Sequence, residues 1–579
     1  MVILGALAVV PAGARAAGTA GTTTAVSTTA ATTTATATDP NTPMLVNSAT
    51  KPPAGYRLNA TQVERIAARD PKIRAELRRH PTATPYEYTK GPGRWQVSWF
   101  SADRKQTELA QVYVDDTTGT VTGAWTGFQV AWTMARGYHG AFGRRVNAWY
   151  VWIPLCIVFV APFIPWRRRP SLLHLDLLVL LAFSISLAFF NRALIGLSVP
   201  LAYPFLLYLL VRMALLAFGR GRPREPLRLL VPVSWLAVVI VFLVGFRVGL
   251  NVTNSNVIDV GYAGVIGADK LIHGKPLYGG WPQDNPQGDT YGPVNYYAYL
   301  PARAIFGWSG RWHRLAAAHA AAIAFDLLTL VGLFFLGRRI RGPSLGIVLA
   351  YAWASYPFSL YVLSSNSNDS LVALLVVLAL LVITSAPGRG IAGALVGLTK
   401  FAPLAMAPLL LRGAGPWPRK RSLLAFAIAF AVTCVVVMLP VLSQDNVRAF
   451  WHDTIAYQSD RGSPFSIWGL WGGLSFEQHL VQGAAAALAV VVAFVPRRRD
   501  LVTVSALGAV VLIALQLGIT HWFYLYIVWF FPLVMVALLG AYPERVGALE
   551  AAQRLDFAPA PKPAEIPVTA GSWALHRAD

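Results

Sequence analysis

The feature that most constrains the fold of this chain is a series of apolar runs, each about as long as a bilayer is thick. A helix needs about 20 apolar residues to cross the hydrocarbon core. Charged residues make up only 13% of the 579 residues, whereas about 25% is usual in soluble domains. We therefore expect an all-α polytopic membrane protein with about 11 transmembrane helices, in the ranges 148–165, 172–190, 198–217, 229–249, 314–336, 343–363, 369–386, 423–442, 480–495, 501–518 and 521–540.

One further apolar segment, 391–411, is interrupted by Pro403 and has basic residues at both ends. Because proline breaks a helix interior, we expect a short helical hairpin that enters the membrane and returns. Lys400 would then lie at membrane depth, where ionisable groups are costly and are usually paired or functional. Asp326 and Asp369 are its expected partners, and a phosphate-binding or gating role is the alternative.

The basic residues predict the orientation of the chain. A net charge of +22 could indicate nucleic-acid binding, but the basic residues gather in short loops on one side of the predicted spans. This positive-inside pattern favours a multi-pass protein of the cell membrane and no nucleic-acid partner. It places 18–147, 250–314 and 443–479 outside and the tail, 542–579, in the cytoplasm.

The N-terminal region combines a targeting segment with a small domain. Residues 1–17 are typical of a signal peptide or membrane anchor, and the Thr/Ala-rich stretch within 18–55 predicts a disordered linker. Within 56–140, Asn59 can cap a helix, and alternation from Trp95 to Phe100 predicts a strand. We expect a small α+β extracytoplasmic domain. Its turn from Asp115 to Val121 resembles that of the PepSY-type module of exported proteins, which implies binding or regulation.

The external loop that follows the span 229–249 carries the most informative carboxylate. Residues 257–273 have helical periodicity, and we expect an amphipathic helix in the outer headgroup layer. Asp259 lies in its first turn, where it could take a proton from a sugar hydroxyl. Tyr262 shares its face. The alternative is that Asp259 caps the helix, and spacing alone leaves both interpretations open.

Further motifs follow Asp259 and Tyr262 in a fixed order. They are Gly274-x-Pro276-x-Tyr278, Tyr291-Gly292-Pro293, Asn366-x-Asn368-Asp369, Gly393-x-x-x-Gly397-Leu398-Thr399-Lys400-Phe401-x-Pro403 and His521-Trp522-Phe523. Together they resemble the GT-C glycosyltransferases, and most nearly the polyprenol-phosphate-dependent family 87. The resemblance covers 229–541, so that the three helices within 148–217 are accessory.

The resemblance implies a hexosyl- or pentosyltransferase, with mannosyl transfer among the candidates. It would move a sugar, with inversion, from a polyprenyl-phosphate donor to a cell-envelope glycan or glycolipid on the outer face of the bilayer. Asp259 would be the catalytic base. From the motifs and from their positions near the membrane surface, we expect the substrate-binding residues to be Tyr262, Arg247, Tyr278, Tyr291, Asn368, Asp369, Lys400 and His521.

Three alternatives stay open. Arg247 could extend to the membrane surface without contacting a substrate. Carboxylates of the external loop could hold Mg²⁺ or Mn²⁺, although the sequence has no repeated Asp-x-Asp spacing and no metal-ligand motif. A transporter or flippase for an envelope lipid or glycan precursor would use the same helices, but it should show internal repeats with matching broken helices, and one interrupted segment is found.

Overall fold

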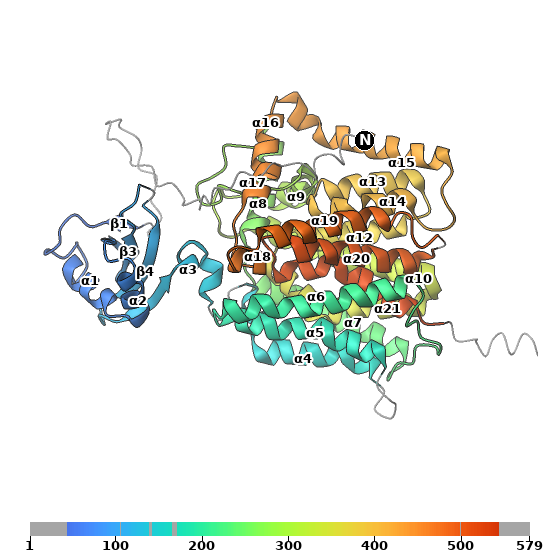
Figure 1. Ribbon diagram of the computed structural model, residues 1–579, viewed down its shortest axis with the longest axis horizontal. Helices are drawn as coiled ribbons and strands as arrows, with labels where there is room; N and C mark the ends of the chain where they lie inside the picture. Colours follow the sequence, from blue (N-terminus) through green and yellow to red (C-terminus); the bar gives the residue numbers. More distant parts are fainter. Residues whose placement is uncertain (1–42, 105, 138–141, 165–170, 498, 544–579) are drawn as a thin grey trace, which may run out of the picture.

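The structure is a computed structural model that describes residues 43–104, 106–137, 142–164, 171–497 and 499–543. A bundle of helices carries a small sheet domain at one end (Figure 1). The predicted signal peptide or anchor at 1–17, residues 18–42 of the predicted linker and residues 544–579 of the predicted tail lie outside the described residues.

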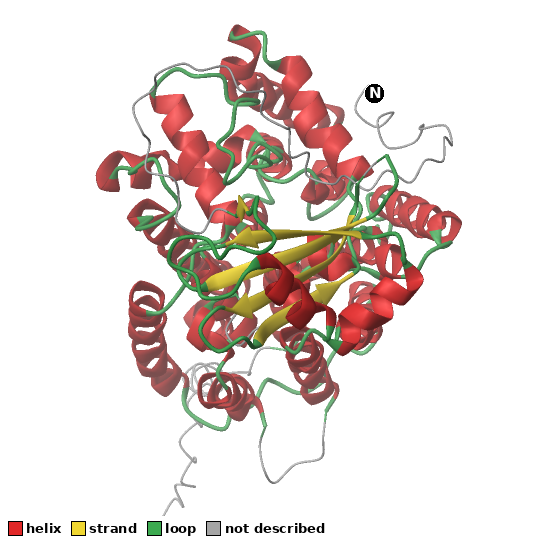
Figure 2. Cartoon of the chain, turned by 90° about the vertical axis from the view of Figure 1, so that its left-hand side faces the viewer, coloured by secondary structure: helices red, strands yellow, loops and turns green. Residues whose placement is uncertain are grey.

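The sheet domain is a five-stranded antiparallel sheet in the order β1-β2-β3-β4-β5, with two helices packed on it (Figure 2). Asn59 accepts a hydrogen bond from the N–H of Gln62 and caps the first helix, as predicted. Trp95, Val97 and Trp99 lie in the core of this domain, so the predicted strand is confirmed, but Gln96 and Ser98 on its other face are buried as well. The elements are β1 (Met44–Leu45), α1 (Ala60–Ala68), α2 (Pro71–Arg79), β2 (Thr84–Thr89), β3 (Arg94–Phe100), β4 (Glu108–Asp115) and β5 (Val121–Thr126).

A short connecting segment with α3 (Phe128–Ala131) and η2 (Thr133–Arg136) leads from the sheet to the bundle (Figure 1). The longer helices of the bundle are α4 (Trp149–Val160), α5 (Leu172–Asn191), α6 (Ile195–Ala217), α7 (Val233–Thr253), α8 (Asp259–Ile272), α9 (Pro293–Phe306), α10 (Ala316–Ser355), α12 (Asp369–Leu381), α15 (Lys420–Ser443), α19 (Ser475–Val491), α20 (Leu501–Gly518) and α21 (Ile527–Gly540). The described residues include six helices long and apolar enough to cross a membrane, and four shorter apolar ones. This arrangement is that of a mostly helical, multi-pass membrane protein.

The remaining short elements connect these helices. They are η3 (Arg144–Asn147), η4 (Ala161–Phe163), α11 (Pro357–Ser365), α13 (Ala386–Gly397), η5 (Ala402–Met406), α14 (Ala407–Arg412), α16 (Val447–Phe450), η6 (Trp451–Ala456), α17 (Tyr457–Asp460), α18 (Ile467–Leu470) and η7 (Tyr524–Tyr526). The backbone of Arg341 and Gly342 is not helical, so α10 is two helices that meet at a kink before Pro343. The predicted boundary between spans 314–336 and 343–363 lies at this kink.

The predicted hairpin at 391–411 is confirmed. Arg389, at the start of α13, donates a hydrogen bond of 2.7 Å to the carbonyl of Leu410 in α14. The far ends of the two helices therefore meet, and Lys400 lies in the turn between them. That turn faces the end of the bundle where α8 and α9 lie.

The basic loops meet at the other end of the bundle. Arg222 pairs with Asp500 at 3.3 Å, and Arg412 donates to the carbonyl of Arg497. Helix α21, the last helix described, also ends at this end of the bundle, opposite the sheet domain (Figure 1). The predicted basic loops that hold Arg222, Arg412 and Arg497 therefore lie at the end of the bundle opposite the sheet domain (Figure 1).

Candidate active site

Asp259 is the first residue of α8, and the Asn366 motif sets its position. The N–H groups of Asn256 and Ile258 donate to the carbonyls of Ser364 and Ser365, at 3.1 and 3.2 Å. Asn366 itself has a left-handed backbone with φ of +50°, and its side chain donates 3.0 Å hydrogen bonds to Ser255 and to the carbonyl of Asn256. The chain before α8 is therefore held by backbone pairing and by a buried amide.

The side chain of Asp259 is exposed and makes no ion pair with a described residue. The N-cap position of α8 belongs to Ile258, and no side chain caps the helix. The capping interpretation holds only in part, because Asp259 is not the N-cap residue, but the backbone N–H of Val260 in the first turn hydrogen-bonds to its carboxylate. Removal from bulk water raises the pKa of this carboxyl group, while the charge of Arg461, a hydrogen bond from the backbone N–H of Val260 and the charge of Lys400 lower it, in that order. Asp259 therefore keeps exposed surface although the protein around it removes it from bulk water, and the charges of two cations act on it. We call the region around Asp259, Tyr291, Lys400, Arg461 and His521 the recess.

The Tyr291 motif and the hairpin turn join at this recess. The N–H groups of Gly292 and Val294 donate to the carbonyls of Thr399 and Leu398, at 3.2 and 3.1 Å. A Cβ on Gly292 would stand 1.9 Å from the carbonyl oxygen of Leu398, so the approach requires glycine. This contact brings Tyr291, which is partly exposed, to Lys400, whose ammonium nitrogen lies 5.6 Å from the centre of the tyrosine ring.

Lys400 is largely buried and pairs with Asp369, with 2.6 Å between Nζ and Oδ1. Trp529 donates to the same oxygen at 2.8 Å. Asp369 and Asp326 were the two predicted partners of Lys400. The pair with Asp369 is confirmed, and Asp326 pairs instead with Arg247. The ammonium group also lies 5.3 Å from the ring centre of Tyr526. The ion pair therefore ties α12, the hairpin turn and α21 together beneath the recess.

His521 and Arg461 form the wall that leads from the recess toward the sheet domain. His521 lies in the loop before η7, six residues before the predicted last span becomes helical at Ile527. Its Nδ1 lies 2.9 Å from the hydroxyl of Ser463. Burial lowers the pKa of His521 well below its usual range, and Arg461 and Lys400 lower it further. The imidazole is therefore neutral and can donate one hydrogen bond.

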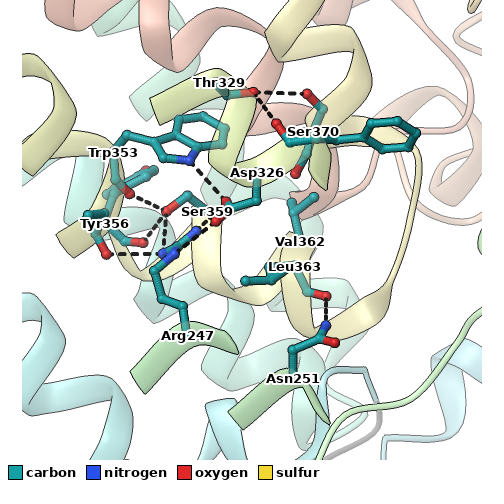
Figure 3. Close-up of polar contacts among 12 residues, drawn as sticks. Arg247, Asn251, Asp326, Thr329, Trp353, Tyr356, Ser359, Val362, Leu363 and Ser370 are labelled. Atoms are coloured by element: carbon teal, nitrogen blue, oxygen red, sulfur yellow. Dashed lines mark hydrogen bonds and ion pairs between the residues drawn. The ribbon is translucent and has the colours of Figure 1, made fainter. Parts of the chain in front are cut away.

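The structure contradicts the predicted substrate contact of Arg247, which has no exposed surface. Its guanidinium group pairs with both carboxylate oxygens of Asp326 and also donates to Ser359 and to the carbonyl of Ala354 (Figure 3). Trp353 donates to the same carboxylate at 2.9 Å. Arg247 could not extend to the surface because Asp326, on the neighbouring helix, neutralises it within the bundle.

Four other predicted substrate contacts are also buried. Tyr262 has no exposed surface and directs its hydroxyl to Asp284 at 3.2 Å. The hydroxyl of Tyr278 donates to the carbonyl of Tyr291 at 2.9 Å. Asn368 donates to the side chain of Asn295 at 2.8 Å, and Asp369 is held as described above. These residues support the walls of the recess and present little surface to a substrate, which is a correction to their predicted roles.

Helix α8 also differs from the prediction, because most of it is buried. The residues Gly261 to Ala268 have almost no exposure, since α8 packs against α9 and α10. Its glycines admit the rings of Tyr296 and Tyr299 from α9 at distances that any Cβ would block. Helix α8 is therefore a packed element of the bundle and does not have the free polar face of an interfacial helix.

The other external carboxylates are dispersed. Asp269 pairs with Arg303 at 2.6 Å, Asp284 receives Tyr262, and Asp289 accepts from the N–H of Gly279 at 2.9 Å. Among the described residues, no group of three or more His, Cys, Asp or Glu side chains could hold a metal ion. Asp259 thus differs from these three carboxylates in the two cations, Arg461 and Lys400, whose charges act on it.

Three residues of the recess were not singled out from the sequence. Arg461 stood among the polar residues of 443–479, without a motif to rank it. Tyr526 follows the His521 motif, where aromatic rings are common at a membrane surface without contacting a substrate. Trp132 lies within the range predicted for the small α+β domain, 56–140, far along the chain from every other residue of the site. Only the folded arrangement brings these side chains to Asp259 and His521.

Comparison with known proteins gives one match. Residues 290–542 match the model of Glycosyltransferase family 87, a segment of somewhat less than half of the chain. The match includes Tyr291, Lys400 and His521 but begins after Asp259. Searches of curated proteins and of solved structures found no significant match. The family match supports a membrane glycosyltransferase, which agrees with the activity expected from the sequence.

Proposed function

We propose that the chain transfers a sugar from a polyprenyl-phosphate donor to a glycan or glycolipid acceptor of the cell envelope. The observation that carries the proposal is the position of Asp259, an exposed and unpaired carboxylate in a recess lined by Arg461, Lys400 and His521. A base next to phosphate-binding groups is the arrangement that transfer from a sugar phosphate needs, and the family match supports the same class of reaction.

In the proposed reaction, Asp259 accepts the proton of an acceptor hydroxyl. The oxygen of that hydroxyl forms a bond to the anomeric carbon as the bond from that carbon to the phosphate oxygen breaks. The attack comes from the face opposite the leaving group, so the configuration inverts. The phosphate leaves with its electron pair, and positive or N–H groups stabilise the charge that develops on it.

Arg461 is the proposed main partner of the leaving phosphate. Lys400 already pairs with Asp369 at 2.6 Å, so much of its charge is compensated, whereas Arg461 has no ion pair with a described residue. A guanidinium group can donate two parallel hydrogen bonds to phosphate oxygens. His521, being neutral, can add one hydrogen bond, and Tyr291 can contact the sugar.

We also propose that the end of the bundle carrying Asp259 faces outside. The cluster of basic loops at the other end supports this orientation by the positive-inside rule. The sheet domain would then be extracytoplasmic, as a PepSY-like module is, and the prenyl chain of the donor would enter from the outer leaflet. This arrangement requires no nucleotide sugar and no nucleotide-binding loop.

The test is transfer by the purified protein in lipid nanodiscs, with a panel of radiolabelled polyprenyl-phosphate sugars and envelope glycan acceptors. We expect product with at least one donor and a loss of at least about 100-fold in Asp259→Asn, since general-base catalysis is worth about 10²–10⁴-fold. Asp284→Asn is the matched control, because Asp284 is an exposed carboxylate of the same external loop, and it should keep most of the activity. Full activity in Asp259→Asn would exclude Asp259 as the base.

A further inference from the structure

The segment that leaves the sheet domain brings an aromatic side chain to the wall of the recess. Trp132 lies between α3 and η2, and its ring centre is 5.7 Å from that of His521 and 5.3 Å from that of Phe465. The guanidinium carbon of Arg461 lies 5.4 Å from the centre of the tryptophan ring. A residue of the N-terminal region therefore contacts Arg461, whose charge acts on Asp259, and His521, on which the charge of Arg461 also acts.

The position of Trp132 is fixed from both sides. Toward the sheet, the guanidinium carbon of Arg136 lies 4.3 Å from the ring centre of Trp125 in β5, and its N–H groups donate to the carbonyls of Gln129 and Val130 at 2.8 and 2.9 Å. Toward the bundle, Gly137 approaches Ala193 so closely that a Cβ would stand 2.3 Å from its backbone nitrogen. The connecting segment is thus a compact corner that joins the sheet to the bundle.

Arg461 depends on aromatic rings for its position. It forms no hydrogen bond and no ion pair with the residues that the structure describes, and its Nε is buried without a partner. The two contacts of its guanidinium group are the rings of Trp132 and Tyr457, at 5.4 and 5.9 Å. Cation–π contacts orient a guanidinium group without using its N–H donors, so these donors stay available to an anion in the recess.

We propose that Trp132 is a positioning residue, which holds Arg461 in the orientation that meets the phosphate of the donor. This inference rests on the proposed function, and it adds that the bundle alone does not complete the active site. The segment leading from the sheet domain supplies one wall. Any movement of the sheet domain that shifts Trp132 would then change the affinity of the site for phosphate.

The experiment compares Trp132→Leu, Trp132→Phe, Arg461→Gln and the double variant Trp132→Leu/Arg461→Gln in nanodiscs. Transfer kinetics and the affinity for polyprenyl phosphate are both measured. We expect Trp132→Leu to weaken kcat/KM for the donor by about 2- to 30-fold, the range of a cation–π contact, and to weaken binding of polyprenyl phosphate as well. Trp132→Phe should recover most of the loss, because it restores a ring. The double variant should be no worse than Arg461→Gln.

The matched control is Trp417→Leu, which removes the ring beside Arg412, 5.0 Å away, at the basic end of the bundle. It should leave both measurements unchanged. Unchanged kinetics and binding in Trp132→Leu would overturn the inference, and so would an equal loss from Trp132→Leu with and without Arg461, since Trp132 would then act independently of it. If the wild type transfers no sugar but binds polyprenyl phosphate in a way that depends on both residues, the proposed reaction fails while the positioning role stands.

Discussion

The buried pair of Arg247 and Asp326 allows a sharp test of whether this arginine is structural. We consider Arg247→Met, which keeps the length of the side chain and removes its charge. In the native protein Asp326 receives hydrogen bonds from Arg247 and from Trp353, and both charged side chains are almost fully buried (Figure 3). The substitution would leave the carboxylate with the indole N–H as its one remaining described partner.

The expected destabilisation follows from that uncompensated charge. Removing one partner of a buried ion pair costs about 3–5 kcal/mol. The double variant Arg247→Met/Asp326→Leu removes both charges, so the main remaining cost is the unpaired indole N–H of Trp353, about 1–3 kcal/mol. We therefore expect the double variant to be more stable than Arg247→Met, even though it carries one more substitution.

The assay is unfolding in mixed micelles with increasing sodium dodecyl sulfate, followed by tryptophan fluorescence, with transfer activity measured on the folded fraction. Arg247→Met should unfold at a lower detergent fraction, the double variant should recover part of the loss, and the folded fraction of each should still transfer sugar. The interpretation is refuted if Arg247→Met keeps wild-type stability but loses donor binding, because Arg247 would then contact the substrate.

Two more predictions concern the recess. Because Asp259 must be ionised to accept a proton, kcat/KM should fall as the pH decreases through its pKa, which removal from bulk water by the surrounding protein raises above the usual aspartate value of about 3.9. Arg461 lowers that pKa, so Arg461→Gln should move the acidic limb of the pH profile to higher pH, and a limb that stays or moves down would contradict the charge assignment. Gly292→Ala should reduce both stability and activity by separating the 291–294 turn from Leu398, whereas Gly249→Ala, with no atom within 4 Å of the new Cβ, should be nearly neutral in the same assays.

The sequence predicts the helices of the bundle well where the apolar membrane environment requires a helix. Apolar runs must become helices, since backbone groups within the hydrocarbon have to pair internally. The break at Arg341 and the hairpin around Pro403 were visible for the same reason. The prediction failed where tertiary contacts decide the ends of a helix. The span expected from 343 to 363 breaks again at Tyr356, and the last helix begins at Ile527, after a loop that carries His521.

The site was predicted less completely, because a sequence motif identifies residues but does not show where their side chains point. Asn368 and Asp369 lie next to the site, but their side chains point into the bundle. Asn368 donates a hydrogen bond to Asn295, and Asp369 pairs with Lys400. Tyr262 shares a helical face with Asp259 in the sequence pattern. In the structure α8 is packed so tightly that Tyr262 is buried and Asp259 is exposed. Exposure at neighbouring positions depends on what packs against the helix, and periodicity does not contain that information.

The arrangement of the charges explains why two cations near Asp259 have different roles. A lysine at the depth of Lys400 needs a counter-charge, and Asp369 supplies one, so the pair can exist without a ligand. Arg461 lacks such a partner among the described residues and is held by ring faces, which neither neutralise its charge nor occupy its donors. In the proposed reaction the site must bind a phosphate and then release it. Lys400, whose charge is paired with Asp369, would hold the walls of the recess in place. Arg461, which has no ion pair with a described residue, would stabilise the negative charge on the leaving phosphate. Under the proposed function, the segment around Trp132 takes part in catalysis indirectly, because it holds Arg461 in place.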